Sequence, residues 1–221
     1  MAAKLLRTSL STEAYDAVRA LVMEGRFPPG GKISVEELTR ALGVSRSPVW
    51  AAIARLEVEG LVEVVPRQGV FMPRRDPAAL ADLFTAREAL EGMVARLAAR
   101  APAAADLALL DRTLLAQRTA MDAGSEADYA DGALVFHQTV MRMGGNVVIE
   151  RMLQTLYDRT RVLCRGDAGF RPGLLRRWEE HARLTDAIRA RDGDRAEREA
   201  RAHIRTLAQE ALAQGAGVEA G

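Results

Sequence analysis

The chain has 221 residues, of which 48% are hydrophobic and 28% are charged, and its formal net charge is +1. This composition is typical of a globular protein, and the length suits one large domain or two modest ones. No apolar run approaches the roughly 20 residues that cross a bilayer, which excludes a membrane-spanning protein. The start, MAAKLLRTSLSTEAY, has no sustained apolar core, and Cys164 has no partner for an intrachain disulfide. We therefore expect a cytoplasmic protein.

Charge is distributed unevenly along the chain. Residues 1–75 contain 11 Lys or Arg and 8 Asp or Glu, whereas residues 76–221 contain 20 Lys or Arg and 22 Asp or Glu. The first part is therefore basic and the second slightly acidic. This is the distribution expected if the N-terminal part contacts the phosphates of a nucleic acid.

The N-terminal part shows the pattern of a winged helix-turn-helix. In STEAYDAVRALVMEGRF, apolar residues recur at helical spacing between an expected N-cap at Ser11 and a glycine stop. Ser34 and Glu37 have the spacing of a capping box, and the short helix that follows ends at Gly43. The next helix begins around Ser45–Pro48. After it, LVEVV, PRQG and VFM predict a small β-hairpin, the wing.

The remaining sequence predicts a helical bundle. PRRDP is polar and bounded by prolines, as expected of a linker, and every strong pattern after it is helical. The helical pattern is interrupted near Pro102 and within residues 122–125, 144–146, 166–173 and 192–194. We predict a mainly α protein: a DNA-binding domain (8–73) of three helices and a hairpin wing, a linker (74–77), and an all-α domain (78–214) of about six helices.

A recognition helix must place its N-terminal residues at base edges while an apolar face holds it in the domain. In GVSRSPVWAAIARL, Arg46 is the strongest candidate for a base contact, because its guanidinium can bind guanine with two hydrogen bonds. Ser45 and Ser47 are short enough to reach phosphates. The alternative is a solvated Arg46 in an ordinary helix pair. In the wing, we expect Arg67 and Gln68 to enter the minor groove, with Gly69 allowing close backbone approach.

This stretch resembles the winged helix-turn-helix of the GntR family of regulators. The resemblance is carried over about 60 residues by EGRFPPGGKI, EELTRALGVSRSPV, LEVEGLVEVV and PRQGVF. It implies sequence-specific binding to double-stranded DNA. The family usually has an arginine that touches the DNA backbone at the position of Trp50, so this difference implies weaker affinity or a shifted site preference. Whether Trp50 stacks on the DNA or packs in the domain is left open.

All three histidines lie in the second domain: His137 in LVFHQTV, His181 in WEEHARL and His203 in RAHIRTL. His181 and His203 fall on neighbouring helices joined by a short turn, so an antiparallel pair would bring them together. Three neutral imidazoles converging inside a bundle would bind a divalent metal, possibly zinc. For each histidine alone, the alternative is a surface or hydrogen-bonded core residue.

The second domain resembles the FCD-type ligand-binding domain of the FadR subfamily. The resemblance rests on AREALE, the FH pair, GGN, and the EH, AI, GD, A and HI run at the end. Metal-binding members add to the three histidines an aspartate four residues before the first, where this chain has Ala133. Asp131 is about 120° away from that histidine around the helix and is a poor substitute. The resemblance therefore implies a three-histidine site completed by water or by the effector.

The resemblance also suggests an effector site. Arg87 in AREALE would pair with the carboxylate of a small organic acid. The alternative is a surface ion pair with Glu91, four residues on. We also expect Asn146 to cap the following helix and to present its amide to the pocket.

These patterns favour a homodimeric transcriptional regulator controlled by a small carboxylate effector, rather than an enzyme. One alternative is a metal-dependent, hydrolase-like enzyme that uses the three histidines to activate water. It lacks a carboxylate placed as a general base, and it leaves the helix-turn-helix unexplained. The other alternative is a DNA-binding protein whose second domain only dimerises.

Overall fold

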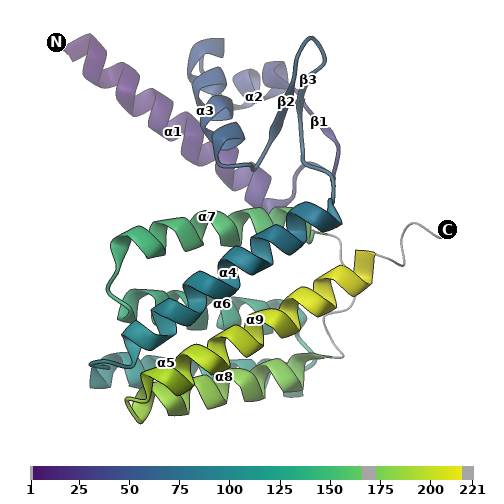
Figure 1. The fold of residues 1–221 in the computed structure, drawn as a ribbon. Helices are drawn as coiled ribbons and strands as arrows, with labels where there is room; N and C mark the ends of the chain where they lie inside the picture. The colour runs from purple at the N-terminus through teal and green to yellow at the C-terminus, as the bar shows by residue number, and fades with distance from the viewer. Residues whose placement is uncertain (1, 166–172, 216–221) are drawn as a thin grey trace. The chain divides into compact units, whose positions relative to one another are not determined.

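The computed structural model describes residues 2–165 and 173–215 (Figure 1). The chain forms two compact units. One contains the residues up to Asp76 together with Tyr157–Arg165, and the other contains the remainder. The predicted domain boundaries, 8–73, 74–77 and 78–214, remain predictions. Within the described residues, none of the helices combines the length and the apolar character needed to span a membrane.

The first unit contains the predicted helix-turn-helix and wing. Its helices are α1 (Ala2–Glu24), α2 (Val35–Leu42) and α3 (Arg46–Val58). Strands β2 (Glu63–Val65) and β3 (Gly69–Phe71) form the predicted hairpin. A further strand, β1 (Lys32–Ile33), pairs antiparallel with β3, giving the order β1-β3-β2. The sequence did not predict β1, because two residues are too few to show a β periodicity.

Local capping explains where the helices of this motif begin and end. The N–H of Glu37 donates to Ser34 Oγ at 3.2 Å, so the Ser34 half of the predicted capping box is confirmed at the start of α2. Gly43 ends that helix in the left-handed conformation, with φ of 63°. The predicted N-cap at Ser11 was wrong, because α1 begins at Ala2 and runs through that residue.

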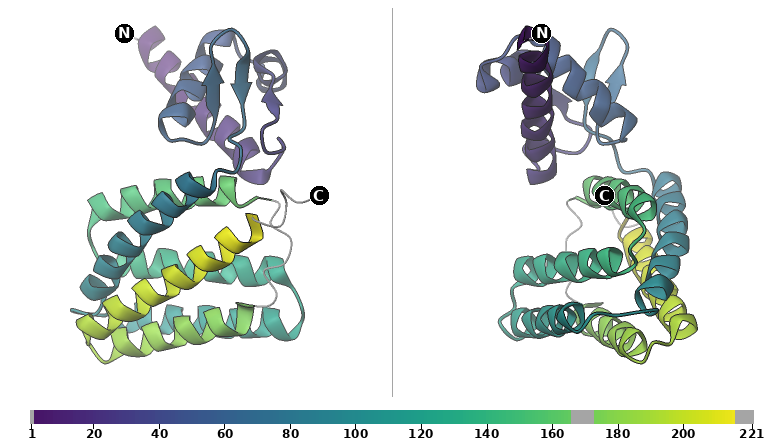
Figure 2. Two further views of the ribbon diagram at one scale, coloured as in Figure 1. Left: turned by 45° about the vertical axis from the view of Figure 1, so that its right-hand side comes forward. Right: turned by 90° about the vertical axis from the view of Figure 1, so that its left-hand side faces the viewer.

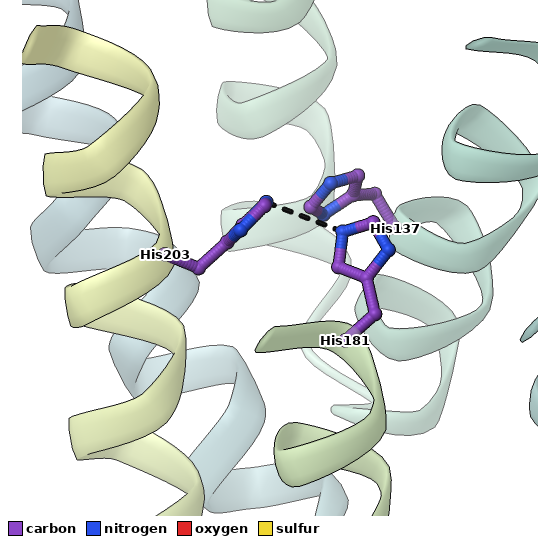
Figure 3. Close-up of side chains that lie close together, drawn as sticks. All are labelled: His137, His181 and His203. Carbon is purple, nitrogen blue, oxygen red and sulfur yellow. Dashed lines mark hydrogen bonds between the residues drawn. The ribbon is translucent and has the colours of Figure 1, made fainter. Parts of the chain in front are cut away.

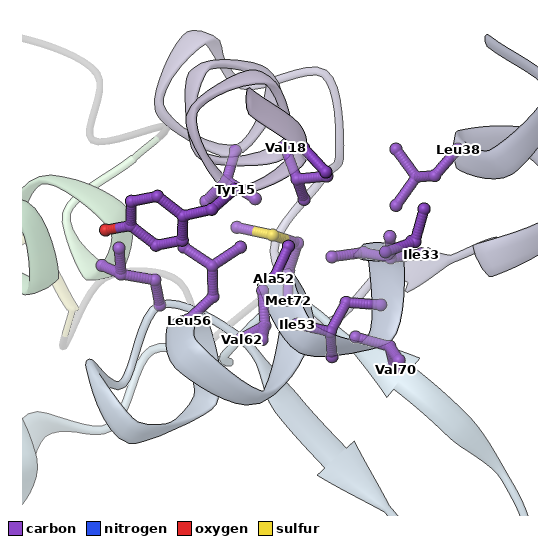
Figure 4. Packing of buried hydrophobic residues seen from close by; sticks show 14 of the residues in the cluster. Tyr15, Val18, Ile33, Leu38, Ala52, Ile53, Leu56, Val62, Val70 and Met72 are labelled. Atoms are coloured by element: carbon purple, nitrogen blue, oxygen red, sulfur yellow. The ribbon is translucent and has the colours of Figure 1, made fainter. Parts of the chain in front are cut away.

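A single apolar cluster holds the motif together (Figure 4). Helix α1 packs on α3, and β1 and the wing close the cluster from the other side. Its members include the following buried side chains: Val18, Ile33, Leu38, Val49, Ile53, Leu56, Val62, Val70 and Met72. This core fixes the orientation of α3, whose opposite face stays exposed.

The second unit is the predicted bundle of six helices. They are α4 (Pro77–Ala98), α5 (Ala104–Asp122), α6 (Glu126–Met143), α7 (Val147–Leu163), α8 (Leu174–Arg189) and α9 (Gly193–Gly215). The end of α7 belongs to the first unit. Helix α4 lies along α9, α5 packs on α6, and α8 packs on α9 (Figure 2). The predicted break at 166–173 lies, except for its last residue, outside the described residues.

Candidate functional site

The three histidines converge inside the bundle. His137 projects from α6, His181 from α8 and His203 from α9 (Figure 3). Their side chains are buried, and one nitrogen of each lies within 4.8 Å of the others. Nε2 of His181 is 3.2 Å from Nε2 of His203. The predicted antiparallel pairing of α8 and α9 thus brings the two imidazoles together, with their rings tilted by 60° and their centroids 4.6 Å apart.

The outward nitrogen of each imidazole lies next to an oxygen atom. Nδ1 of His181 is 2.8 Å from Oε1 of Gln117 on α5, and Nδ1 of His203 is 2.8 Å from Oε2 of Glu180 on α8. Nδ1 of His137 is 3.4 Å from Oε2 of Glu91 on α4. An Nδ1–H that donates to such an oxygen leaves a lone pair on Nε2. The two Nε2 atoms face each other across the gap between α8 and α9 at hydrogen-bond distance, 3.2 Å.

Burial favours the neutral form of two of the imidazoles, His181 and His203. It lowers the pKa of His181 well below its ordinary value, and the neighbouring His203 and His137 lower it further. Burial also lowers the pKa of His203, although its hydrogen bond to Glu180 acts in the opposite direction. Burial alone would raise the pKa of Glu180, but the contacts with His203, the hydrogen bond from Thr206 and the charge of Arg176 together outweigh it, and the pKa is lowered. At neutral pH, His181 and His203 are thus in the uncharged form that binds metals.

The spacing of His181 and His203 fits a divalent ion. Two nitrogens that bind one tetrahedral zinc ion at about 2.0–2.1 Å are about 3.3–3.4 Å apart, and the two Nε2 atoms are 3.2 Å apart. Outer oxygen partners that fix the tautomer of ligating histidines are a regular feature of metal sites. Within the described part of the chain, the group of side chains close enough to share an ion consists of the three histidines. Asp131 is exposed, as its place on α6 predicted.

A small cavity lies beside the cluster. Its free volume, about 10 Å³, is close to what one water molecule needs. Polar groups in its wall come from three residues already described, Glu91, His137 and His203, and the remaining wall is apolar: Val94, Val140, Met141, Leu184 and Ala200. The cavity therefore combines one carboxylate and two imidazoles with an apolar lining.

Arg87 lies deep in the bundle and forms the ion pair that was its alternative role. Its Nε donates to Oε1 of Glu91 at 2.9 Å, and both side chains are buried, so this is not a surface pair. Asn146 caps α7, as expected, by accepting hydrogen bonds from the N–H groups of Val148 and Ile149. It is not among the residues that line the cavity. Effector contacts of Arg87 and Asn146 remain predictions.

The predicted DNA-contacting residues at the start of α3 are exposed. Ser45, at the N-cap position, makes no capping hydrogen bond with its side chain, and Ser47 is exposed. Arg46 begins α3, and its guanidinium contacts the Glu36 carboxylate of α2 at 2.6 Å in an exposed ion pair. Trp50 is 43% exposed, so its ring is not part of the core. The DNA roles of these side chains remain predictions.

The tip of the wing is also exposed. Arg67 and Gln68 lie between β2 and β3, and Arg67 has a φ of 63°, which is unusual for a residue other than glycine. Gly69 has a φ of 122°, and a Cβ there would lie 3.1 Å from Cε of Lys32. Lys32 lies beside the wing because β1 pairs with β3. The sequence did not predict this position, because it did not predict β1.

Comparisons with known proteins agree with both units. Residues 10–72 match the family described as bacterial regulatory proteins, gntR family, and residues 82–206 match the FCD domain. An uncharacterized HTH-type transcriptional regulator in the TAR-I ttuE-ttuC' intergenic region of Agrobacterium vitis is 34% identical over 131 residues, 58% of this chain and 77% of that protein. The HTH-type transcriptional repressor RspR of Escherichia coli strain K12 is 26% identical over 204 residues, 90% of this chain and 88% of that protein.

A solved structure shows the same fold. E. coli McbR/YncC superimposes with a TM-score of 0.78 at 21% identity, covering 93% of this chain and 98% of that chain. At this identity, the similarity is informative about the fold alone.

Proposed function

The chain belongs to the GntR family of bacterial transcriptional regulators and carries an FCD domain, and on this premise we propose that its bundle is a metal-dependent sensor of a small organic acid. The DNA-reading part is the helix-turn-helix with its wing, for which we propose residues 8–73. The sensing part is the bundle, proposed as residues 78–214, which also forms a homodimer. Binding of the acid changes the affinity of the paired DNA-binding domains for their operator.

One observation carries the metal site: two buried Nε2 atoms face each other at 3.2 Å while both Nδ1 atoms lie 2.8 Å from oxygen acceptors. Without a cation or a shared proton, this arrangement directs two lone pairs at each other. The residues that would hold the ion are His137, His181 and His203. A bound divalent ion would supply a Lewis acid with coordination positions left for water or a carboxylate oxygen.

The environment of the cluster supports an anionic effector with an apolar part. Five apolar side chains form most of the cavity wall. The cavity holds about one water molecule, so a larger acid requires Met141 or Leu184 to move. Arg87, whose guanidinium is held by Glu91, is the proposed cationic contact of the acid.

Metal analysis of the purified protein tests the site. After dialysis, the wild-type chain is expected to retain about one zinc ion, and His181→Ala is expected to lose it while keeping its helical circular dichroism. Glu179→Ala, which removes an exposed carboxylate from the same helix, is the matched control and keeps the ion. Equal zinc content in wild type and His181→Ala would contradict the proposed site.

A gel-shift competition tests the DNA-reading part, with an operator selected from random DNA by the purified protein. We expect Arg46→Ala to lose the preference for this operator over a scrambled duplex, at a cost of about 1–3 kcal/mol. Arg198→Ala is the control, because it removes the same charge from an exposed position on α9. An unchanged preference in Arg46→Ala would refute its role as the base-reading residue.

Thermal denaturation tests the sensing part. A panel of small organic acids is screened against the zinc-loaded wild type, and an effector raises its melting temperature. The same acid is expected to have no effect on zinc-treated His181→Ala. Stabilisation of that variant to the same extent would show that the acid binds elsewhere.

A further inference from the structure

The outward partners of the three histidines differ in charge. Those of His137 and His203 are carboxylates, whereas His181 has the neutral amide of Gln117. Gln117 is fully buried on α5, and its Oε1 is 2.8 Å from Nδ1 of His181. Its Nε2 is also buried and has no hydrogen-bond partner in the part of the chain that the structure describes.

An amide at this position is costly for a purely structural role. A buried donor without a partner loses its hydrogen bonds to water and gains none in the protein. A glutamate would accept the same proton from Nδ1 more strongly and would leave no unused donor. The close approach of Gly132, where a Cβ would lie 3.0 Å from Cγ of Gln117, shows that the packing around this side chain is tight.

The difference between amide and carboxylate changes the net charge of the site. The charge of Glu91 is balanced by Arg87 at 2.9 Å, and Arg177, which is also buried, is balanced by Glu210 at 2.6 Å. The Glu180 carboxylate is hydrogen-bonded to His203 and lies close enough to Arg176 for that charge to lower its pKa, so its charge is partly balanced too. With these carboxylates balanced, a divalent cation among three imidazoles leaves the site positively charged, whereas a carboxylate in place of Gln117 would lower that charge by one unit.

We propose that Gln117 is a positioning residue for His181, which builds on the proposed metal site. Its amide oxygen fixes the Nδ1–H tautomer and turns Nε2 toward the ion. Because the amide is neutral, it leaves the loaded site with the positive charge that attracts an anion. Compared with a glutamate at this position, Gln117 therefore lowers the affinity of the site for the metal and raises the affinity of the loaded site for a carboxylate ligand.

Two variants separate this role from packing. Gln117→Glu is expected to bind zinc about ten times more tightly than wild type in a chelator competition, because a carboxylate makes the imidazole more basic. Gln117→Leu is expected to bind it about 10–100 times more weakly, because the orienting acceptor is lost. Gln138→Glu, which adds the same charge at an exposed position of α6, is the control and stays within about twofold of wild type.

The second readout is anion binding. Protein loaded with cobalt(II) is titrated with acetate, and the change in the visible absorption of the metal gives the affinity. Gln117→Glu is expected to bind acetate several-fold more weakly than wild type, although it holds the metal more tightly. Opposite changes in the two affinities support the proposal. Parallel changes, or none, overturn it.

A third measurement needs no variant. Nitrogen-15 NMR of the metal-free wild type is expected to show His181 protonated at Nδ1, and protonation at Nε2 alone would overturn the proposal, because Gln117 would then be a donor to Nδ1. A wild type that binds no zinc would refute the proposed metal site itself. A wild type that binds zinc with the same affinity as both Gln117 variants would refute only the inference about Gln117.

Discussion

Replacing Arg87 by methionine tests the buried ion pair of α4. The Arg87 and Glu91 side chains are 5% and 9% exposed, and Nε lies 2.9 Å from Oε1. Removing one partner of a buried pair leaves an uncompensated charge and typically costs about 3–5 kcal/mol, whereas replacing both partners by apolar residues is often neutral or stabilising. We expect Arg87→Met to lower the free energy of unfolding of the metal-free protein by about 3–5 kcal/mol. The double variant Arg87→Met/Glu91→Leu should recover most of this loss.

Urea denaturation followed by circular dichroism measures both values. The control is Arg142→Met, which breaks the exposed ion pair with Asp106 at 2.8 Å and is expected to cost at most about 1 kcal/mol. A loss below about 1 kcal/mol for Arg87→Met, or a double variant no more stable than the single one, would refute the reasoning. The result also decides how effector assays on Arg87 variants are interpreted, because a strong loss of stability requires comparison with the double variant.

Three further predictions concern pH, DNA binding and the metal ligands. Burial lowers the pKa values of His181 and His203, so below pH 6.5 the unfolded chain binds protons that the native chain does not. The free energy of unfolding of the metal-free protein should therefore fall as the pH drops from 7 toward 5, by up to about 1.4 kcal/mol per histidine and pH unit, and urea titrations independent of pH would contradict this. Glu36→Gln frees Arg46 from its exposed ion pair and should raise affinity for non-specific DNA in low-salt anisotropy measurements; weaker non-specific binding would contradict it. Ala133→Asp places a carboxylate one turn before the first histidine and should tighten zinc binding several-fold in a chelator competition; weaker binding would show that its side chain does not reach the ion.

The helix-turn-helix could be predicted because its signals are local. The Ser34 cap and Gly43 are close in sequence to the helix that they delimit, and the apolar spacing of α3 shows directly which face is buried. The pairing of β1 with β3 depends instead on residues about 40 positions apart. The start of α1 was placed too late because Ser11 has the residue type of an N-cap, although the helix continues through it.

The sequence predicted the contacts within the histidine cluster only between helices that follow each other directly in the chain. A short turn between α8 and α9 makes His181 and His203 neighbours, and this holds in the structure. The partner of His181, in contrast, comes from α5, 64 residues earlier in the chain. No local pattern distinguishes Gln117 from other glutamines, so its role emerges only when the helices are packed.

The exposure of Trp50 shows a similar limit. Its place in the sequence left both packing and stacking open, and the structure excludes the core as its location. The ion pair of Glu36 with Arg46 joins α2 to α3 across the turn of the motif. Their separation of ten residues matches no helical repeat, so this contact had no signal in the sequence.

Operator affinity measured with and without zinc tests most directly whether the histidine cluster controls DNA binding. Fluorescence anisotropy with the selected operator is carried out on chelator-treated protein before and after adding one equivalent of zinc. The wild type is expected to change its dissociation constant by about 5–150-fold, the usual range of coupling between sites, and His181→Ala is expected to show no change. Equal operator affinity of the wild type in the two conditions, with zinc shown to be bound, would contradict the claim.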